Sequence, residues 1–320
     1  MEYLYYAGDD RFGALGVSTS ATEYAPRALG PLPRLEDAQQ LSGVAAKVEA
    51  SEPLSALEAR IIAGGGSPLG GAKPKALINI EGVQWVIKFF NNEPVDAPLV
   101  EHATMKLAAL AGISVAATQV VRLSGLHAVA IRRFDRTVGG GRIHSVSAST
   151  AIRAATAAGQ EPLLGYPELA RLLRRAGVAT DGANLQDARE LFRRMVFNIL
   201  MDNTDDHEKN HVLIRGDDGF YDLSPAFDVV SSVQGLGYQQ MRVGAKGHEA
   251  SMANALSEVA AFGLSKVDAG LIALQIATHV DSWETEFLAL NATPADMAVL
   301  SQYLDGSVLR SERLKSMALS

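Results

Sequence analysis

The sequence NTDDHEKNH at residues 203–211, followed by SPAFD at residues 224–228, determines how the rest of this chain is interpreted. Asp205 is a carboxylate that can orient a hydroxyl group, Asn210 is an amide five positions later, and Asp228 is a second carboxylate. In-line phosphoryl transfer from ATP uses a carboxylate at the acceptor hydroxyl and hard oxygen ligands for Mg²⁺. The pattern therefore predicts a phosphoryl-transfer site in which Asp205 is catalytic and Asn210 and Asp228 bind the metal.

The segment between the two motifs predicts a β-hairpin. Residues 212–214 (VLI) form an apolar strand, residues 217–219 (DDG) are typical of a turn, and residues 220–223 (FYDL) form a returning strand. Such a hairpin brings Asp228 back beside Asn210. A helix predicted over residues 185–201 leads directly into the first motif.

Two other interpretations of the first motif stay open at this stage. Asn, Thr and Asp are common turn formers, so residues 203–206 also fit a connecting loop without chemistry. The string HEKNH at residues 207–211 matches the H-E-x-x-H pattern of helical zinc sites. The apolar strand that follows it and the lack of an obvious third ligand argue against zinc.

A glycine-rich loop precedes the first clear strand. Residues 64–75 read GGGSPLGGAKPK, and residues 76–80 form an apolar strand. Backbone N–H groups of Gly70, Gly71 and Ala72 can surround phosphate oxygens, with countercharge from Lys73 or Lys75. The loop does not match the Walker pattern, because neither lysine directly follows a glycine or precedes Ser or Thr. A flexible surface turn is the alternative.

The next strand, residues 84–90, contains a single lysine. Lys88 interrupts an apolar run, and a buried ammonium group is costly unless it meets an anion. This position suits a ligand of the ATP phosphates, and a lysine at the edge of a sheet is the alternative. Glu101 is expected in the first turn of the following helix, where it either pairs with Lys88 or is stabilised by the helix dipole.

A second strand pair, residues 114–123 and 126–134, is joined by a Ser-Gly turn. It leads to Arg132 and Phe134, where the hinge between two lobes is expected. There the backbone is expected to bind adenine, with Phe134 packed nearby. A solvated, charged strand end is the alternative. Beyond this point the pattern is mainly helical, with helices predicted over residues 166–176, 185–201, 267–288 and 294–303.

Length and composition agree with a two-lobed enzyme. The chain has 320 residues, which is more than one hydrophobic core usually organises. Hydrophobic residues make up 48% and charged residues 20%, as in ordinary globular proteins. The absence of cysteine excludes disulfides and thiolate chemistry, and no secretory signal or membrane span is recognisable. We therefore expect a cytoplasmic protein without a membrane segment. The net charge of −7 disfavours direct binding to nucleic acid, so any DNA role is expected through a basic partner.

Together these motifs resemble the HipA-type serine/threonine kinases, the toxins of HipA/HipB toxin–antitoxin systems. The motifs that carry the resemblance are SPLGGAKPK (67–75), WVIKF (85–89), RFDR (133–136), NTDDHEKNH (203–211) and LSPAFD (223–228). The resemblance implies an α+β, bilobal protein-kinase-like fold. Residues 1–132 would form a mixed N-lobe, and residues 133–320 a mainly helical C-lobe.

The resemblance also implies function. It implies Mg-ATP as cofactor, phosphorylation of a protein serine or threonine, and contacts of His207 and Lys209 with the cofactor. Ser67 resembles an autophosphorylation site in the glycine-rich loop, where a phosphate would expel the loop from the ATP site.

The chain also departs from the family. Full-length members carry a small subdomain before the region that corresponds to residues 8–15, so this chain resembles the short HipT-like toxins. The expected partners are a HipB-like DNA-binding antitoxin, a small HipS-like protein, and a protein substrate such as an aminoacyl-tRNA synthetase. A degenerate kinase that acts as a corepressor or scaffold is the alternative. A small-molecule or lipid kinase would share the same ATP and metal residues.

Overall fold

The computed structural model describes residue 5, residues 8–27 and 30–55, residue 58, and residues 73–90, 93–179 and 182–318. Ser67, Gly70, Gly71 and Ala72 lie outside the described residues, and so does most of the glycine-rich loop. The chain divides into two compact units. The first unit is Met1–Glu93, Ala97–Leu99 and Ala116–Ser145, and the second is Pro94–Asp96, Val100–Val115 and Val146–Ser320.

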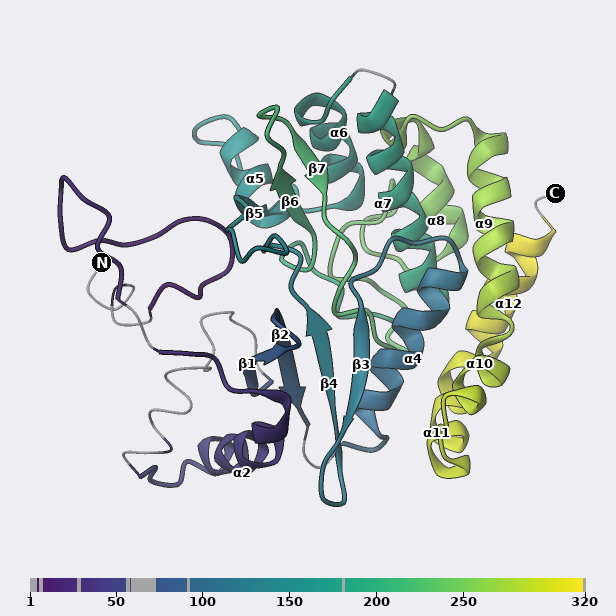
Figure 1. Cartoon of the computed structure of the whole chain (residues 1–320). Helices are drawn as coiled ribbons and strands as arrows, with labels where there is room; N and C mark the ends of the chain where they lie inside the picture. The colour runs from purple at the N-terminus through teal and green to yellow at the C-terminus, as the bar shows by residue number, and fades with distance from the viewer. Residues whose placement is uncertain are drawn as a thin grey trace. The chain divides into compact units, whose positions relative to one another are not determined.

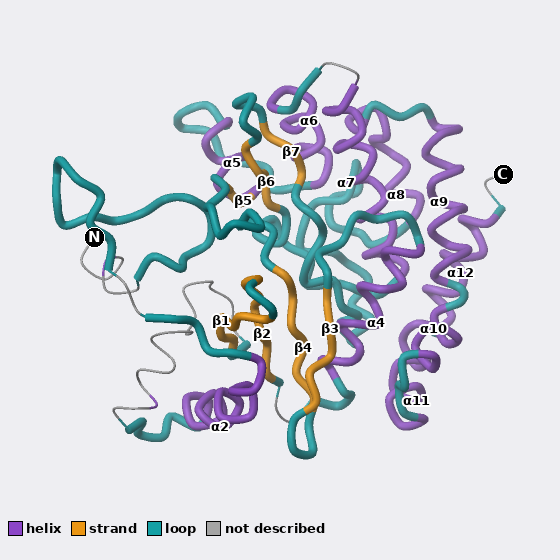
Figure 2. Tube along the Cα trace, viewed as in Figure 1, coloured by secondary structure: helices purple, strands orange, loops and turns teal. Residues whose placement is uncertain are grey.

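The first unit contains a four-stranded antiparallel sheet with the order β1-β2-β4-β3 (Figure 2). Its strands are β1 (Lys75–Ile80), β2 (Val83–Phe89), β3 (Thr118–Arg122) and β4 (His127–Arg132). A two-residue turn at Ser124 and Gly125 joins β3 to β4, and the positive φ of Gly125 (78°) suits glycine. The predicted strand pair and its turn are therefore confirmed.

One face of this sheet is covered by α2 (Ala38–Glu49), which follows the short 3₁₀ helix η1 (Leu35–Asp37). The core between them contains Ala38, Leu41 and Ala45 of the helix, and Ala76, Ile78, Ile87, Phe89, Val121, Ala128 and Ala130 of the strands. Because side chains alternate along a strand, Lys88 points to the opposite face from Ile87 and Phe89. The sheet thus presents a lysine on the face that α2 does not cover.

The second unit is mainly helical (Figure 1). Its elements are α4 (Ala97–Leu110, from Val100 onward), β5 (Ser145–Ser147, from Val146 onward), α5 (Ala148–Ala155), α6 (Tyr166–Ala176), α7 (Ala183–Leu200), β6 (Val212–Arg215), β7 (Tyr221–Leu223), α8 (Met252–Ala255), η3 (Leu256–Phe262), α9 (Lys266–Val280), α10 (Trp283–Ala289), α11 (Pro294–Leu304) and α12 (Ser307–Met317). None of the helices within the described part of the chain has the length and apolar character needed to cross a bilayer.

Helix α7 organises the core of this unit, because it packs against α6, α9 and η3. The side chains of Leu191, Phe192 and Met195 are fully buried, and the ring of Phe192 lies edge-on to that of Phe262 at 5.2 Å. The C-terminal end of α7 is therefore held firmly where the chain enters the motif at residues 203–211.

The predicted hairpin after that motif is present. Strands β6 and β7 pair antiparallel, with Leu213 opposite Leu223, and the amide of Ser224 donates to the carbonyl of Val212 at 2.8 Å. In the turn, the amide of Gly216 donates to the carbonyl of Phe220. The hairpin returns the chain to the level of residue 212, as the sequence predicted.

The helix predicted over residues 267–288 is wrong as a single element, because the chain breaks between α9 and α10. At the break, the hydroxyl of Ser282 donates to the carbonyl of His279, and Asp281 pairs with Arg313 at 3.2 Å. Short polar side chains compete with the helix for hydrogen bonds in this way. The apolar pattern on both sides of the break hid it from the sequence.

Candidate active site

The two adjacent aspartates that follow α7 have opposite environments. Residues 201–211 form a series of turns and contain no helix. Asp205 is exposed, whereas Asp206 is only 3% exposed. Of the two carboxylates, Asp205 is therefore the one that can meet an acceptor molecule.

Asp206 is the centre of a buried polar network in the second unit. Its Oδ2 accepts hydrogen bonds from the hydroxyl of Tyr166, from Nδ2 of Asn198 at 2.9 Å and from Nε2 of His211 at 2.8 Å. Asn198 in turn accepts a hydrogen bond on Oδ1 from Asn203 at 3.0 Å. Burial alone would raise the pKa of Asp206, but the interaction with His211 and the hydrogen bond from Tyr166 lower it below its ordinary value.

Asn210 and Asp228 supply hard oxygen donors. Asn210 is 8% exposed, and its backbone N–H donates to the carbonyl of His207 at 2.9 Å. A small cavity of about 10 Å³ is lined by Asn210 together with Phe227 and Val229, the neighbours of Asp228. Asp228 is half-buried and has a left-handed backbone with φ of 59°, a conformation that a non-glycine residue adopts at some energetic cost. The structure thus brings Asn210 close to the residues that flank Asp228.

This donor set fits Mg²⁺. Mg²⁺ is usually held by one or two carboxylate or other oxygen ligands of the protein, with waters and substrate phosphates completing the octahedron. One amide oxygen and one carboxylate match that requirement. Among the described residues, no group of three or more His, Cys, Asp or Glu side chains is arranged to hold a metal ion.

The zinc interpretation of residues 207–211 is wrong. This segment is a turn, so His207 and His211 do not share one face of a helix. This feature is incompatible with the H-E-x-x-H geometry, in which two histidines one helical turn apart bind the same ion.

Of the other predicted cofactor residues in this segment, Lys209 is exposed and His207 is half-buried. Nδ1 of His207 is buried and has no hydrogen-bond partner in the described part of the chain.

Asp202, which the sequence analysis did not select, fixes the chain that follows Asp228. Its Oδ2 accepts hydrogen bonds from the amides of Gln234 and Gly235, both at 3.0 Å. Nearby, the amide of Thr204 donates to the hydroxyl of Ser232 at 2.9 Å. Burial raises the pKa of Asp202. These bonds join residues 202–204 to residues 232–235, and no local pattern could have revealed this pairing.

In the first unit, Lys88 is 6% exposed and lies on β2, which is flanked by β1 and β4. The alternative of a lysine at the sheet edge is therefore wrong. Lys75 lies opposite Lys88 in the register of β1 and β2 and is half-buried. Two lysines at one end of this strand pair concentrate positive charge there.

Glu101 belongs to the second unit and is 1% exposed. Helix α4 begins at Ala97, so Glu101 is past the first turn, and the expectation that it lies there is wrong. Stabilisation at the helix N-terminus therefore does not explain this buried carboxylate. Its pairing with Lys88 stays a prediction.

At the expected hinge, Arg132 is exposed and Phe134 is half-buried. The ring of Phe134 lies edge-on to that of Phe12, with centroids 5.5 Å apart. Phe134 therefore packs against the N-terminal segment of its own unit.

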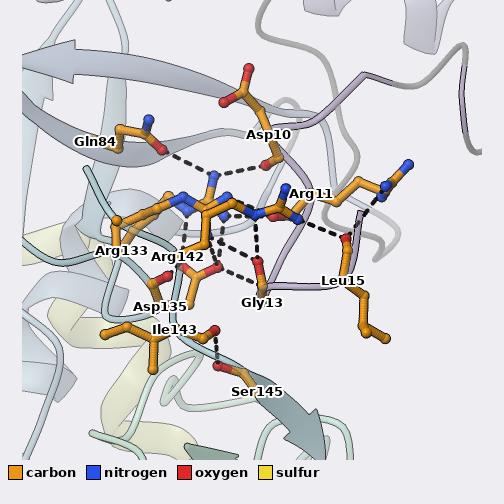
Figure 3. A network of polar contacts seen from close by, with 12 residues as sticks. Asp10, Arg11, Gly13, Leu15, Gln84, Arg133, Asp135, Arg142, Ile143 and Ser145 are labelled. Carbon is orange, nitrogen blue, oxygen red and sulfur yellow. Dashed lines mark hydrogen bonds and ion pairs between the residues drawn. The ribbon is translucent and has the colours of Figure 1, made fainter. Parts of the chain in front are cut away.

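Beside Phe134 lies a buried charge cluster that the sequence analysis missed (Figure 3). Asp135 is fully buried and accepts hydrogen bonds from Arg133, from Arg136 and from the amide of Gly13 at 2.7–2.9 Å. Arg133 also donates from Nη1 to the carbonyl of Asp10 and from Nη2 to the carbonyl of Arg11. The alternative of a solvated strand end is wrong, because this cluster binds residues 10–13 to the end of β4.

Two solved structures have a fold similar to that of this chain. HipA of Shewanella oneidensis MR-1, solved in a complex with HipB and operator DNA, superposes with a TM-score of 0.57 at 16% identity, over 77% of this chain and 64% of that chain. The proinflammatory kinase CtkA of Helicobacter pylori superposes with a TM-score of 0.58 at 13% identity, over 78% of this chain and 94% of that chain. The fold is therefore the α+β, HipA-like kinase fold.

The sequence comparisons define the family. The pattern of the HipA-like C-terminal domain matches residues 67–283, more than half of the chain. A candidate kinase of Sinorhizobium fredii (strain NBRC 101917 / NGR234), Y4dM, is 32% identical over 164 residues, which are 48% of this chain and 38% of that protein. The chain thus spans less than two thirds of Y4dM and of the Shewanella HipA. It belongs to the HipA-like C-terminal domain family, a family of HipA-type kinases.

Proposed function

We propose that this protein is an ATP- and Mg²⁺-dependent serine/threonine protein kinase. The observation that carries the proposal is the second unit's arrangement of three residues: Asp205 is exposed, and Asn210 lies against the residues that flank Asp228. A phosphoryl-transfer site needs a carboxylate free to meet the acceptor and two oxygen ligands near each other.

In this proposal Asp205 accepts a hydrogen bond from the acceptor hydroxyl, orients it for in-line attack, and receives its proton. Asn210 and Asp228 hold Mg²⁺ through the amide oxygen and the carboxylate. Bound Mg²⁺ neutralises the charge that develops on the phosphates. The left-handed backbone of Asp228 sets the direction in which its side chain leaves the chain.

The first unit is proposed to supply most of the contacts with ATP. Lys88, buried on the central strand β2, binds the phosphates. The glycine-rich loop at Gly70, Gly71 and Ala72 donates backbone N–H groups, and Lys75 adds positive charge. The backbone at Arg132 and Phe134 binds adenine, Glu101 orients Lys88, and His207 and Lys209 contact the phosphates from the second unit.

Ser67 is proposed as an autophosphorylation site. A phosphate there adds about two negative charges to a loop that must accommodate the phosphates of ATP, so it would repel the nucleotide. Mass spectrometry after incubation with Mg-ATP should find phosphate on Ser67. A fully active enzyme that never carries phosphate at this residue would contradict the assignment.

The biological role proposed is that of a toxin in a HipA-type toxin–antitoxin system. The structural similarity to a HipA solved with HipB and operator DNA supports a HipB-like antitoxin as partner. A net charge of −7 supports contact with DNA only through that partner. We propose a small HipS-like protein as a second partner, and as substrate a protein such as an aminoacyl-tRNA synthetase, in the cytoplasm and without membrane attachment.

The test is phosphoryl transfer from ATP with a radiolabelled γ-phosphate, with and without cell extract. The variants are Asp205→Ala and Asp228→Ala, and Asp217→Asn in the exposed turn between β6 and β7 is the matched control. We expect label on the protein or on one extract component with wild type and with the control, and a loss of several orders of magnitude in both site variants. A lack of any ATP binding would favour a corepressor or scaffold over a kinase, and label only on small molecules or lipids would overturn the assignment of a protein substrate.

A further inference from the structure

We infer that Asp206 and His211 form an internal clasp that positions Asp205 and Asn210 for phosphoryl transfer. This inference rests on the proposed function and deepens it. Neither residue is catalytic, because both are buried and face the interior of the second unit. Their role is to set the conformation of the chain between them.

The clasp closes a short stretch of chain. Oδ2 of Asp206 and Nε2 of His211 are 2.8 Å apart, and the two residues are five positions apart in sequence. Between them, the backbone N–H of Asn210 donates to the carbonyl of His207, so the enclosed turn also contains an internal hydrogen bond. Asp205 directly precedes the clasp and Asn210 lies inside it. A turn closed by a side-chain pair leaves its members little conformational freedom.

The clasp is anchored to rigid elements on both sides. Asp206 is bound by Tyr166 at the start of α6 and by Asn198 in the last turns of α7. The ring of His211 lies edge-on to that of Tyr166 at 5.7 Å. The carbonyl of His211 accepts a hydrogen bond from the amide of Ala148 at 2.7 Å. The turn is thus attached to three helices, α5, α6 and α7, instead of moving as a surface loop.

The cavity beside His211 has room for one water molecule. Nδ1 of His211 and Nη1 of Arg194 are both buried and have no hydrogen-bond partner in the described chain. Both residues line the cavity of about 10 Å³ that also touches Asn210. A cavity of roughly this size holds one water if polar groups surround it. Water can accept from the guanidinium and exchange a hydrogen bond with Nδ1, so one water would satisfy both groups.

The clasp is expected to affect the proposed metal ligands, Asn210 and Asp228. Asp206, His211 and Asn210 line this cavity together with Phe227 and Val229, so the clasp and the neighbours of Asp228 face the same small space. Groups that orient metal ligands without touching the metal typically change metal affinity or activity about 10- to 100-fold when they are replaced. We expect an effect of this size from the clasp.

The experiment compares Asp206→Asn, His211→Phe and the double variant with wild type. Asparagine keeps the shape of Asp206 but loses its charge, and phenylalanine keeps the ring contact with Tyr166 but loses both nitrogens. Glu312→Gln is the matched control, because Glu312 is also a buried carboxylate, bonded to the amide of Met252 at 2.7 Å, but lies on α12. For each protein we would measure Mn²⁺ affinity in the presence of ATP by electron paramagnetic resonance, kcat, KM for ATP, and the melting temperature.

The clasp predicts that both single variants weaken Mn²⁺ binding and lower kcat about 10-fold or more, while KM for ATP changes little. The double variant should be no worse than the more affected single variant, because each removes the same interaction. The control should melt at a lower temperature with unchanged Mn²⁺ affinity. A merely structural role would lower the melting temperature of all the variants and leave Mn²⁺ affinity unchanged.

Folded variants with wild-type Mn²⁺ affinity and kcat would overturn the clasp. If one variant does not fold, the other decides the question. A high-resolution crystal structure should show the water between Arg194 and His211, and its absence would overturn that part of the inference. An inactive wild type would refute the proposed function, whereas an active wild type with unaffected clasp variants would refute only the clasp.

Discussion

Replacing Asp135 by asparagine should strongly destabilise the first unit. The carboxylate is fully buried and receives hydrogen bonds from Arg133, from Arg136 and from the amide of Gly13. Both arginine side chains are at most 5% exposed. The isosteric amide cannot balance their charges, and it accepts on one atom instead of two, so the variant removes the buried carboxylate that both guanidinium groups share.

The size of the expected loss in stability follows from the burial of this ion pair. Removing one partner of a buried ion pair costs about 3–5 kcal/mol, because the other charge is left uncompensated. We expect this loss in the free energy of unfolding of the first unit. As a control in the same unit, Glu36→Ala removes an ion pair with Arg34 in which both side chains are more than 70% exposed. Exposed pairs contribute about 0–1 kcal/mol, so this variant should unfold much like its parent.

The chain offers a reporter for each unit, because its two tryptophans are Trp85 and Trp283. In a Trp283→Phe background, urea unfolding followed by fluorescence reports on the first unit alone. In a Trp85→Phe background it reports on the second. Asp135→Asn should lower the midpoint seen by Trp85 and leave the midpoint seen by Trp283 nearly unchanged. A loss below about 1 kcal/mol at Trp85 would refute the reasoning from burial.

The same cluster has a predicted pH dependence. Burial alone would raise the pKa of Asp135, but the hydrogen bonds and charges of Arg133 and Arg136 lower it below its ordinary value. A lowered pKa in the folded state means that the stabilisation is present above the unfolded pKa of about 4 and is lost as pH falls through the folded pKa. The difference in stability between wild type and Asp135→Asn should therefore shrink on acidification below about pH 4.

Two further predictions concern the second unit. Burial raises the pKa of Asp187 to about 6, although a hydrogen bond from the amide of Leu223 opposes this rise. The protonated carboxyl group therefore stabilises the folded state fully below about pH 4, and this stabilisation is lost as pH rises through about 6. Asp187→Asn should thus stabilise this unit by about 1–2 kcal/mol at pH 8 and by nothing at pH 4, in urea unfolding followed by the fluorescence of Trp283. Equal stability of variant and wild type at both pH values would contradict the raised pKa. Phe192→Ala should cost about 3–5 kcal/mol in the same assay, because the fully buried ring packs edge-on against Phe262. Leu314→Ala, at an exposed site on α12, is its control, and a similar cost for both variants would contradict this account of the core.

Much of the local structure was readable in the sequence. Helix α6 runs over Tyr166–Ala176 as predicted, because Pro167 favours the first turn and Gly177 ends the helix. The hairpin of β6 and β7 and the turn at Ser124 and Gly125 were also correct, since alternating apolar residues and turn formers act within a few positions. Elements that depend on distant partners were not readable, as the break between α9 and α10 shows, where Asp281 pairs with Arg313 of α12.

For the candidate site, the sequence by itself determined the order of chemical groups: a carboxylate, an amide five positions later, and a second carboxylate after a hairpin. It also determined the family, because those groups occur in ordered motifs. It could not distinguish Asp205 from Asp206 by any physical property, since adjacent aspartates have the same chemistry. The choice of Asp205 came from its place in the motif.

Only the tertiary structure decided which of the two is buried. Asp206 is bound by Tyr166, 40 positions away in sequence, and Asp135 is bound by Gly13, 122 positions away. A buried charge persists only where the fold assembles donors around it, and those donors come from separate elements. The sequence therefore named the chemistry, whereas the packing of α6 and α7 around Asp206 left Asp205 as the exposed carboxylate.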